Sequence, residues 1–267
     1  MKKSPIAEAF NNCRNKKRPA LLTYTVAGDN TKNKSLEILK KISHSVDIVE
    51  LGLPHNTPVA DGGQIQNSTF RSLKKGMKIK NIFQIVRSYK KFPFSKPLII
   101  MTYYNPVLQY GKNKFLKDCK KNGVNGLIIV DFPWPENRMF AKKCKKNSIE
   151  FVQLLSPTTT KERLIKIKRD SHNMCYYISS LNTTGGKFKI SPEKIFNNYK
   201  TIKKLYSNKN LVIGFGITEK TIAYFKKTDG VVVGSLICKE ITKSLNNRQN
   251  PATNVSNMVK KLRNKIA

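Results

Sequence analysis

Residues 47–66, which read DIVELGLPHNTPVADGGQIQ, decide the fold of this chain. They begin with the short apolar run Ile48-Val49, and the carboxylate Glu50 follows where this run should end. Such a run is typical of a strand that is buried on both faces, and a Glu at its end is costly to bury unless it is used. A loop rich in Gly, Pro, Asn and Thr then carries a second carboxylate, Asp61. Taken alone, Glu50 fits a satisfied buried acid or a helix cap better than a functional group, so the rest of the chain must decide.

The length of 267 residues is enough for one full core and is close to the length of one closed α/β barrel. The longest apolar runs, residues 97–101 and 127–130, fall far short of a membrane span. The basic N-terminus has no apolar stretch behind it, which argues against a secretory signal. Five cysteines, widely spaced and without a CxxC pair, suit a reducing cytosol. We therefore expect a cytoplasmic protein with no membrane span and no metal site.

A formal net charge of +35 suggests nucleic acid as a partner, but the distribution of the basic residues argues against it. Only nine of the 51 basic residues are Arg, which reads bases and phosphates better than Lys does. The lysines are spread over nearly every helical segment, and 26 Asn residues accompany them as a general drift in composition. We expect weak, salt-sensitive binding to nucleic acid and no specific recognition.

Short apolar segments without polar alternation recur along the chain, and a helical pattern follows each of them. They predict eight buried strands, at residues 20–26, 46–51, 97–101, 126–130, 150–154, 175–179, 211–214 and 230–233. Strands buried on both faces and joined by helices form a parallel sheet. Eight such units in a chain of this length predict a (β/α)8 TIM barrel that occupies residues 1–267 as a single domain. A doubly wound open sheet is the alternative, but no G-x-G-x-x-G motif follows the first strand.

Helical patterns add to the basic barrel at three places. Residues 4–15 predict an extra N-terminal helix with Ser4 as its N-cap. Residues 65–89, after the second strand, are long enough for two helices, and two more follow the eighth strand. We expect residues 102–111 to form a loop and residues 218–226 to form a helix.

In a barrel of this kind, the carboxyl ends of the strands and the loops after them form the active face. Each of the distinctive side chains near these ends could have a purely structural role in a turn or in the core. Their convergence on one rim nevertheless predicts an active site. The residues are Glu50, Asp61, Tyr103, Asn105, Asp131 and Tyr176.

Glycines predict a second feature at the same rim. They lie at Gly185-Gly186, at Gly214 and Gly216, and at Gly234 before Ser235, after the sixth, seventh and eighth strands. Barrels often bind phosphate at the loops after the last two strands, beside the N-terminus of a short helix. Glycine lets the backbone come close, and free N–H groups favour an anion. Turn glycines are the simpler interpretation, but three neighbouring sites favour a small phosphorylated substrate.

From about residue 19 to residue 240, the chain resembles the α subunit of tryptophan synthase. Several independent motifs in order make this resemblance more specific than any one of them. They are LLTYTVAGD (21–29), VELGLP (49–54), VADGGQIQ (59–66), MTYYNPVLQYG (101–111), GLIIVDFP (126–133), TTGG (183–186), GFGIT (214–218) and VVVGS (231–235).

The resemblance implies a lyase that cleaves indole-3-glycerol phosphate to indole and glyceraldehyde 3-phosphate by a retro-aldol step. Glu50 and Asp61 match the two catalytic carboxylates of the family. A carboxyl group at a buried strand end, with its pKa raised by desolvation, can act as acid and then as base near neutral pH. Asp61, on a loop open to solvent, is expected to stay ionised and to accept a hydrogen bond from the indole N–H.

The same resemblance implies the substrate contacts and the partner. The indole pocket is lined by Tyr24, Ile65, Met101, Ile128, Tyr176 and Phe215. The phosphate group is held by Thr184, Gly185, Gly216, Gly234 and Ser235. The family subunit has no cofactor of its own and partners a pyridoxal-phosphate-dependent β subunit in an αββα heterotetramer, with a tunnel that passes indole between the two sites.

The chain departs from the family pattern in two loops. Residues 54–58 read PHNTP, and Thr57 stands where the family has an aspartate that signals to the β subunit. In the loop after the sixth strand, Ser180 replaces an arginine and Asn182 replaces a glycine. That loop is the lid that excludes water from the site. These changes suggest an alternative function, a catalytically weakened subunit that is retained chiefly to bind and activate β.

Overall fold

The computed structural model describes residues 4–179, 190–214 and 216–267. Within them, parallel strands form one sheet in the order β5-β4-β3-β2-β1-β9-β8-β7-β6. The strands are β1 (Ala20–Val26), β2 (Ile48–Gly52), β3 (Leu98–Thr102), β4 (Gly126–Ile129), β5 (Glu150–Phe151), β6 (Gln153–Leu155), β7 (Met174–Ile178), β8 (Asn210–Gly214) and β9 (Gly230–Val233).

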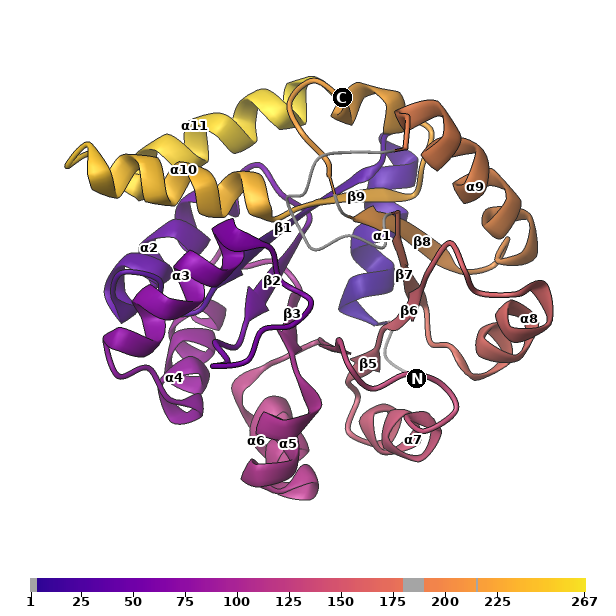
Figure 1. Cartoon of the computed structure of the whole chain (residues 1–267), viewed down its shortest axis with the longest axis horizontal. Helices are drawn as coiled ribbons and strands as arrows, with labels where there is room; N and C mark the ends of the chain where they lie inside the picture. Colours follow the sequence, from indigo (N-terminus) through magenta and orange to yellow (C-terminus); the bar gives the residue numbers. More distant parts are fainter. Residues whose placement is uncertain (1–3, 180–189, 215) are drawn as a thin grey trace.

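The sheet closes on itself through the segment that carries β5 and β6. We predicted one strand over residues 150–154, and the structure divides it at Val152 into two short strands. β5 pairs with β4 and β6 pairs with β7, so this one segment joins both edges of the sheet. The result is a closed parallel barrel with eight strand positions inside a ring of helices (Figure 1), which confirms the predicted TIM-barrel fold.

The helices follow the predicted order with two corrections. They are α1 (Pro5–Asn15), α2 (Lys32–Ile42), α3 (Gly63–Lys74), α4 (Ile79–Lys90), α5 (Tyr104–Tyr110), α6 (Lys112–Asn122), α7 (Arg138–Lys146), α8 (Lys161–Asp170), α9 (Pro192–Leu205), α10 (Ser235–Asn246) and α11 (Pro251–Asn264). The expected loop at residues 102–111 contains α5, because a proline is tolerated in the first turn of a helix. The expected helix at residues 218–226 is only a short 3-10 turn, η1 (Ile222–Phe225).

Side chains alternate between the barrel interior and the layer beneath the helices. Along β1, Leu22 belongs to the interior cluster and Leu21 to the layer that packs against the helices. The extra helix α1 closes one end of the interior, where Ile6 and Phe10 join the same cluster as Leu22. Ser4 caps this helix as predicted, since its side chain accepts the Ala7 N–H. The interior is therefore sealed at the amino-terminal end of the strands.

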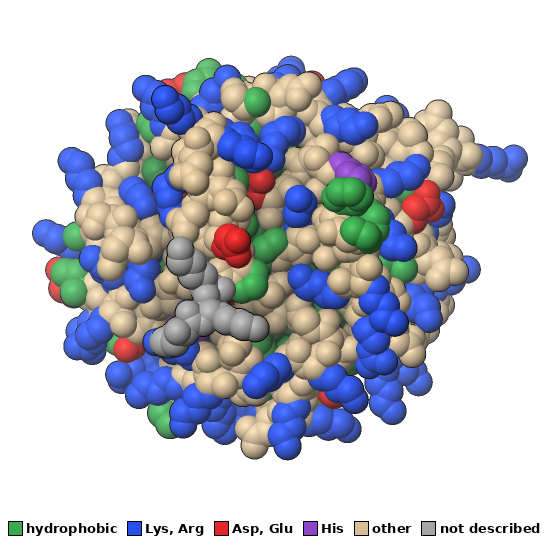
Figure 2. Space-filling model, turned by 180° about the vertical axis from the view of Figure 1, so that it is seen from behind, with side chains coloured by type: hydrophobic (Ala, Val, Ile, Leu, Met, Phe, Trp, Pro, Cys, Tyr) green, Lys and Arg blue, Asp and Glu red, His purple; other side chains and the backbone are tan. Residues whose placement is uncertain are grey.

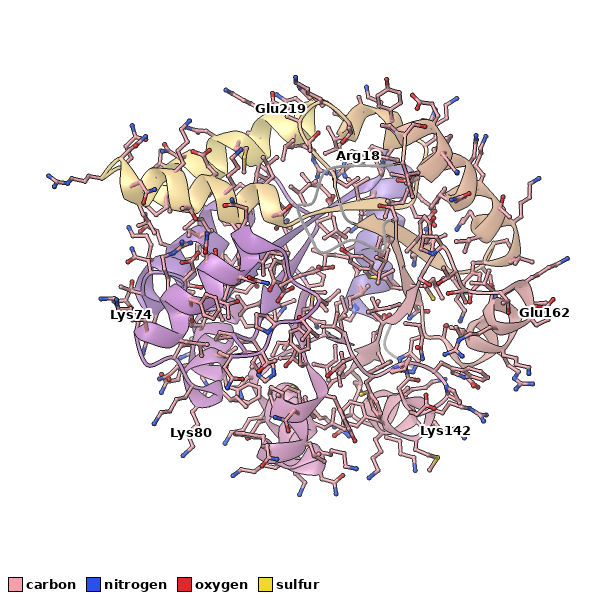
Figure 3. All side chains as sticks on the ribbon, in the orientation of Figure 1. Arg18, Lys74, Lys80, Lys142, Glu162 and Glu219 are labelled. Atoms are coloured by element: carbon pink, nitrogen blue, oxygen red, sulfur yellow. The ribbon has the colours of Figure 1, made fainter. Side chains whose placement is uncertain are left out.

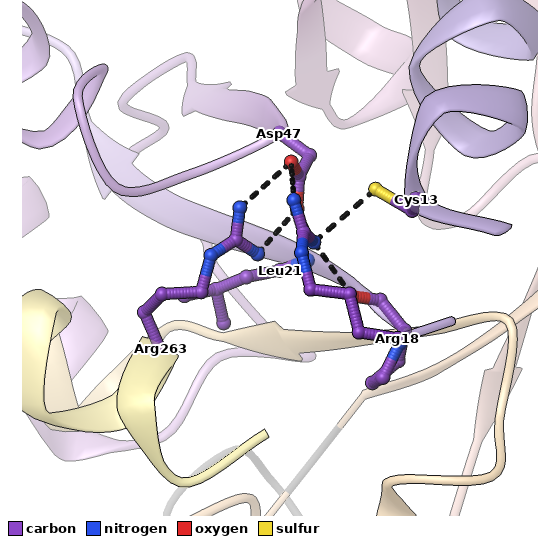
Figure 4. A network of polar contacts seen from close by, with 6 residues as sticks. Cys13, Arg18, Leu21, Asp47 and Arg263 are labelled. Carbon is purple, nitrogen blue, oxygen red and sulfur yellow. Dashed lines mark hydrogen bonds and ion pairs between the residues drawn. The ribbon is translucent and has the colours of Figure 1, made fainter. Parts of the chain in front are cut away.

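A partly buried ion cluster fastens the C-terminal helix to this sealed end (Figure 4). Asp47, directly before β2, accepts two hydrogen bonds from Arg18 at 2.8 and 2.9 Å and two from Arg263 of α11 at 2.7 and 2.9 Å. Its Oδ2 also accepts the Leu21 N–H at 2.8 Å. Burial alone would raise the pKa of Asp47, but the bonds from both arginines outweigh it and hold this pKa well below its usual value.

The remaining charge is dispersed over the outside of the molecule. Figure 2 shows Lys and Arg side chains spread over one whole face without a single basic patch. Figure 3 shows Lys74, Lys80 and Lys142 pointing outward from the helices, whereas Arg18 lies inside their ring. Among the residues that the structure describes, no helix is long and apolar enough to cross a membrane.

We expect Asp47→Asn to lower the free energy of unfolding by about 2 kcal/mol at neutral pH, because two partly buried guanidinium groups lose their charged hydrogen-bond partner. Since the folded pKa of Asp47 is depressed, its contribution is complete above the unfolded pKa of about 4 and is lost as the pH falls further. Urea denaturation over a pH series measures both effects. The exposed pair Lys265–Glu219 serves as the control, and Glu219→Gln should cost less than about 0.5 kcal/mol. Equal losses for both variants would contradict the assignment.

Candidate active site

One cavity opens at the carboxyl ends of the strands and gathers residues from most of the barrel. The strands and loops around it bring together side chains that are far apart in the sequence. Its lining residues are Tyr24, Glu50, Ala60, Asp61, Ile65, Met101, Val130, Tyr176, Gly216, Ile217, Val232, Gly234 and Ser235. Nine of the positions predicted from the sequence are among them.

Glu50 is the most deeply buried acid of this cavity. It lies in β2 between its register partners Tyr24 of β1 and Ile99 of β3, and it is fully buried. Neither of its carboxyl oxygens has a hydrogen-bond partner among the residues that the structure describes. Burial raises the pKa of Glu50 to about 8, so the carboxyl group is largely protonated at neutral pH. A neutral acid on an otherwise apolar floor is suited to donate a proton.

Asp61 is less open to solvent than we expected. Burial raises its pKa to about 6, and a hydrogen bond from the Tyr103 hydroxyl partly opposes this rise. The Tyr103 oxygen also accepts the Ala60 N–H at 3.0 Å, so it holds both the loop and the carboxylate. The expectation of a solvent-exposed loop acid is wrong, because β3 places Tyr103 directly against this loop. Asp61 is still mostly ionised at neutral pH.

Two tyrosines flank Glu50, and each depends on a glycine that makes room for its hydroxyl group. A Cβ on Gly52 would overlap the Tyr24 hydroxyl, and one on Gly214 would overlap the Tyr176 hydroxyl. Both rings are more than nine-tenths buried. The phenols therefore occupy space that only glycine leaves free at the strand ends.

The N-terminus of α10 faces the cavity through two residues. Gly234 accepts the Ile237 and Cys238 N–H groups as the helix begins, and Ser235 is its first residue. Gly216, on the neighbouring loop, has a φ of +63°, which glycine adopts without strain. Free N–H groups at the start of a 12-residue helix, together with the helix dipole, favour an anion here.

Not every predicted residue lies at the cavity. Ile128 of β4 pairs in register with Met101 but is fully buried in the barrel interior and does not line the cavity. Thr184, Gly185 and Phe215 lie outside the described residues.

The structure adds Ala60, Val130, Ile217 and Val232 to the lining. Each is next or close in sequence to a predicted residue, and this adjacency was the available signal. Asp131 has a structural contact, since its carboxylate accepts the Tyr104 N–H at 2.6 Å where α5 begins. Among residues 4–179, 190–214 and 216–267, no group of three or more His, Cys, Asp or Glu side chains could hold a metal ion.

A closed parallel barrel with an acid pair and an anion-binding helix end around one cavity defines a (β/α)8-barrel enzyme. The family model described as Tryptophan synthase alpha chain matches residues 10–267. The tryptophan synthase alpha chain of Pelagibacter ubique (strain HTCC1062) is 64% identical over 97% of this chain and 98% of its own length. That of Thermococcus kodakarensis is 37% identical over 93% and 94%.

Solved structures agree with these relatives. The tryptophan synthase subunit alpha from Legionella pneumophila str. Paris matches with a TM-score of 0.91 and 26% identity, over 99% of this chain and 98% of that one. The structure of Mycobacterium tuberculosis tryptophan synthase matches with a TM-score of 0.86 and 25% identity, over 99% of both chains.

The chain belongs to the tryptophan synthase alpha chain family. Its activity is that of an indole-3-glycerol-phosphate lyase in tryptophan biosynthesis. The pyridoxal phosphate of tryptophan synthase belongs to the β chain. Each of these statements was expected from the sequence motifs, and the comparisons confirm them.

We expect Gly52→Ala to displace the Tyr24 ring and to weaken the binding of the substrate analogue indole-3-propanol phosphate by about tenfold or more. The reason is that overpacking a buried site costs roughly 1–3 kcal/mol. Isothermal titration calorimetry at one temperature measures the dissociation constant of the analogue. Gly63→Ala is the matched control, since a Cβ there meets nothing within 4 Å. Unchanged binding by Gly52→Ala would contradict the assigned packing.

Proposed function

We propose that Glu50 and Asp61 divide the work of cleaving indole-3-glycerol phosphate. The reaction breaks the bond between indole C3 and C3′ of the glycerol chain. Indole C3 must gain a proton, and the C3′ hydroxyl group must lose one as the aldehyde forms. The observation that carries the proposal is the pair of acids in one cavity with unequal burial.

Glu50 suits the proton transfers. With a pKa near 8 it is protonated at neutral pH, and it can give its proton to indole C3 and then accept the proton of the C3′ hydroxyl group. Its two oxygens have no partner in the described structure, so neither must leave another hydrogen bond to react. The apolar surroundings that raise its pKa also exclude water that would compete for the proton.

Asp61 suits the stabilisation of charge. Protonation of indole C3 leaves positive charge on the ring, and an ionised carboxylate that accepts the indole N–H stabilises it. The hydrogen bond from Tyr103 favours the ionised form and fixes the direction of the carboxylate. Tyr24, Ile65, Met101 and Tyr176 would enclose the indole ring, while Gly216, Gly234 and Ser235 would hold the phosphate group.

We expect Glu50→Gln to lower kcat by at least about a hundredfold, because the amide cannot transfer the proton. Folding should survive, since the amide resembles the protonated carboxyl group that the folded chain already contains. The raised pKa of Glu50 destabilises the fold as the pH rises from the unfolded value of 4.5 toward about 8, so the variant should be at least as stable at neutral pH. Indole release measures turnover, and urea denaturation measures stability.

Glu162→Gln, which changes an exposed acid on α8 (Figure 3), is the matched control and should keep full activity. Normal turnover by Glu50→Gln would falsify the proposed role.

We expect kcat/KM to follow a bell-shaped pH profile with limbs near the pKa values of about 6 for Asp61 and about 8 for Glu50. Below the first value Asp61 becomes protonated and loses its charge, and above the second Glu50 loses the proton that it must donate. Asp61→Asn should lower activity and remove the acidic limb. An acidic limb that persists in Asp61→Asn would assign it to another group.

We also propose that residues 1–267 form a single domain, that the protein is cytoplasmic, and that it binds the tryptophan synthase β subunit in an αββα heterotetramer. The match to a structure of whole tryptophan synthase supports the β partner. A route for coupling lies beside the cavity, because the His55 ring packs against Tyr103 with centroids 5.2 Å apart, and Tyr103 holds Asp61. A partner that moves the loop of His55 would therefore move Asp61.

The alternative function, a weakened subunit that mainly activates β, is motivated by Thr57 and by the changes at Ser180 and Asn182, which lie outside the described residues. Indole release from the isolated chain and from its complex with β separates the two. The intact acid pair in the cavity favours an active lyase. Turnover that stays negligible in the complex, while β is still activated, would support the alternative.

A further inference from the structure

We propose that the Tyr24 hydroxyl group is a specificity-determining contact that donates a hydrogen bond to a hydroxyl oxygen on the glycerol chain of the substrate. This inference rests on the proposed function, because it concerns the same substrate in the same cavity. It assigns Tyr24 a polar role in addition to its packing against indole.

The position of Tyr24 carries the first part of the inference. Tyr24 and Glu50 are register partners on β1 and β2, and both line the cavity. The base of the Tyr24 ring packs toward Gly234, where a Cβ would lie 3.3 Å from the Tyr24 Cβ. Its hydroxyl group reaches Gly52, two residues beyond Glu50 along β2. The ring thus spans from the proposed phosphate site to the acid pair, which is the path that the glycerol chain must follow.

The state of the hydroxyl group carries the second part. Two other buried tyrosines have partners: the Tyr206 hydroxyl donates to the Leu164 carbonyl at 2.7 Å, and the Tyr89 oxygen lies 2.6 Å from the Ser43 hydroxyl. Tyr24 is only 7% exposed, yet no hydrogen bond joins its hydroxyl group to any residue that the structure describes. The Tyr24 oxygen, unlike the two Glu50 oxygens, is not completely buried, and Tyr24 lines the cavity. A ligand hydroxyl group that enters the cavity can therefore reach this oxygen and replace water as its partner.

The electrostatic surroundings decide the direction of the bond. Burial, and next the nearby Asp61 carboxylate, raise the pKa of Tyr24 well above its usual value. The phenol therefore keeps its proton and remains a donor throughout the pH range of the reaction. Glu50 is expected to accept the proton of a hydroxyl group on the glycerol chain. The Tyr24 hydroxyl group would then donate its own proton to a lone pair of a hydroxyl oxygen on the same chain.

Tyr176 is the second phenol of the cavity, and it comes from β7. Its hydroxyl group lies against Gly214 of β8, and burial, followed by the nearby Glu50, raises its pKa. Tyr24 alone combines contact with Gly234 at one end and closeness to both acids at the other.

The test compares two ligands in the Glu50→Gln background, in which indole-3-glycerol phosphate is expected to persist. The second ligand is indole-3-propanol phosphate, which has the same indole and phosphate groups but no hydroxyl group on the linking chain. We expect the added substitution Tyr24→Phe to weaken the binding of indole-3-glycerol phosphate by about tenfold, through the lost hydrogen bond. Binding of indole-3-propanol phosphate should change by less than about twofold. Calorimetric titration of the full chain gives both dissociation constants.

Tyr224→Phe, at a half-exposed tyrosine of η1, is the control and should change neither affinity. Equal weakening of both ligands by Tyr24→Phe would overturn the inference in favour of a packing role, and so would unchanged binding of both. Retained affinity for indole-3-propanol phosphate also shows that the variant is folded. If Glu50→Gln still turns over the substrate, the proposed catalytic role fails, and the ratio of KM values for Tyr24→Phe and the unchanged chain then tests the hydrogen bond separately.

Discussion

Closure of the barrel through the segment of β5 and β6 is the constraint on which the rest of the structure depends. Because this segment pairs with β4 on one side and β7 on the other, the described strands form one closed sheet. Every second side chain of each strand must then point into a sealed interior, with α1 closing the far end. Among the described residues, the strands place the polar side chains of Glu50, Tyr24 and Tyr176 at the carboxyl rim, where they line the cavity.

Two acids three residues apart, one directly before β2 and one in its middle, show how strongly the surroundings set their chemistry. Asp47, directly before β2, has two arginines as partners, and its pKa falls. Glu50, three residues later, has no cationic partner in the described structure, and burial alone raises its pKa to about 8. The first acid stabilises the fold by tying α11 to the barrel, as Figure 4 shows. The second is held in a form that can donate a proton, at a cost in stability that function explains.

Most of the architecture could be predicted from the sequence, because apolar runs, helical periodicity and capping residues act locally. The failures are also local in origin. Residues 104–110 read as a turn because of Asn105-Pro106, yet a helix tolerates a proline in its first turn. Residues 218–226 show a helical pattern but form only one short 3-10 turn. A helix of this length is not stable by itself, so tertiary packing decides whether it forms.

The sequence by itself determined the family, the barrel and the identity of the acid pair, because strand composition and ordered motifs can be read without coordinates. Only the tertiary structure decided how each group behaves. It placed Tyr103 against Asp61, which made a supposedly exposed acid partly buried, and it kept Ile128 away from the cavity. It also placed the Tyr24 hydroxyl group at the cavity near Glu50, with no hydrogen-bond partner among the described residues. Such properties depend on which atoms surround a group in space, and in a barrel those atoms come from strands that are distant in the chain.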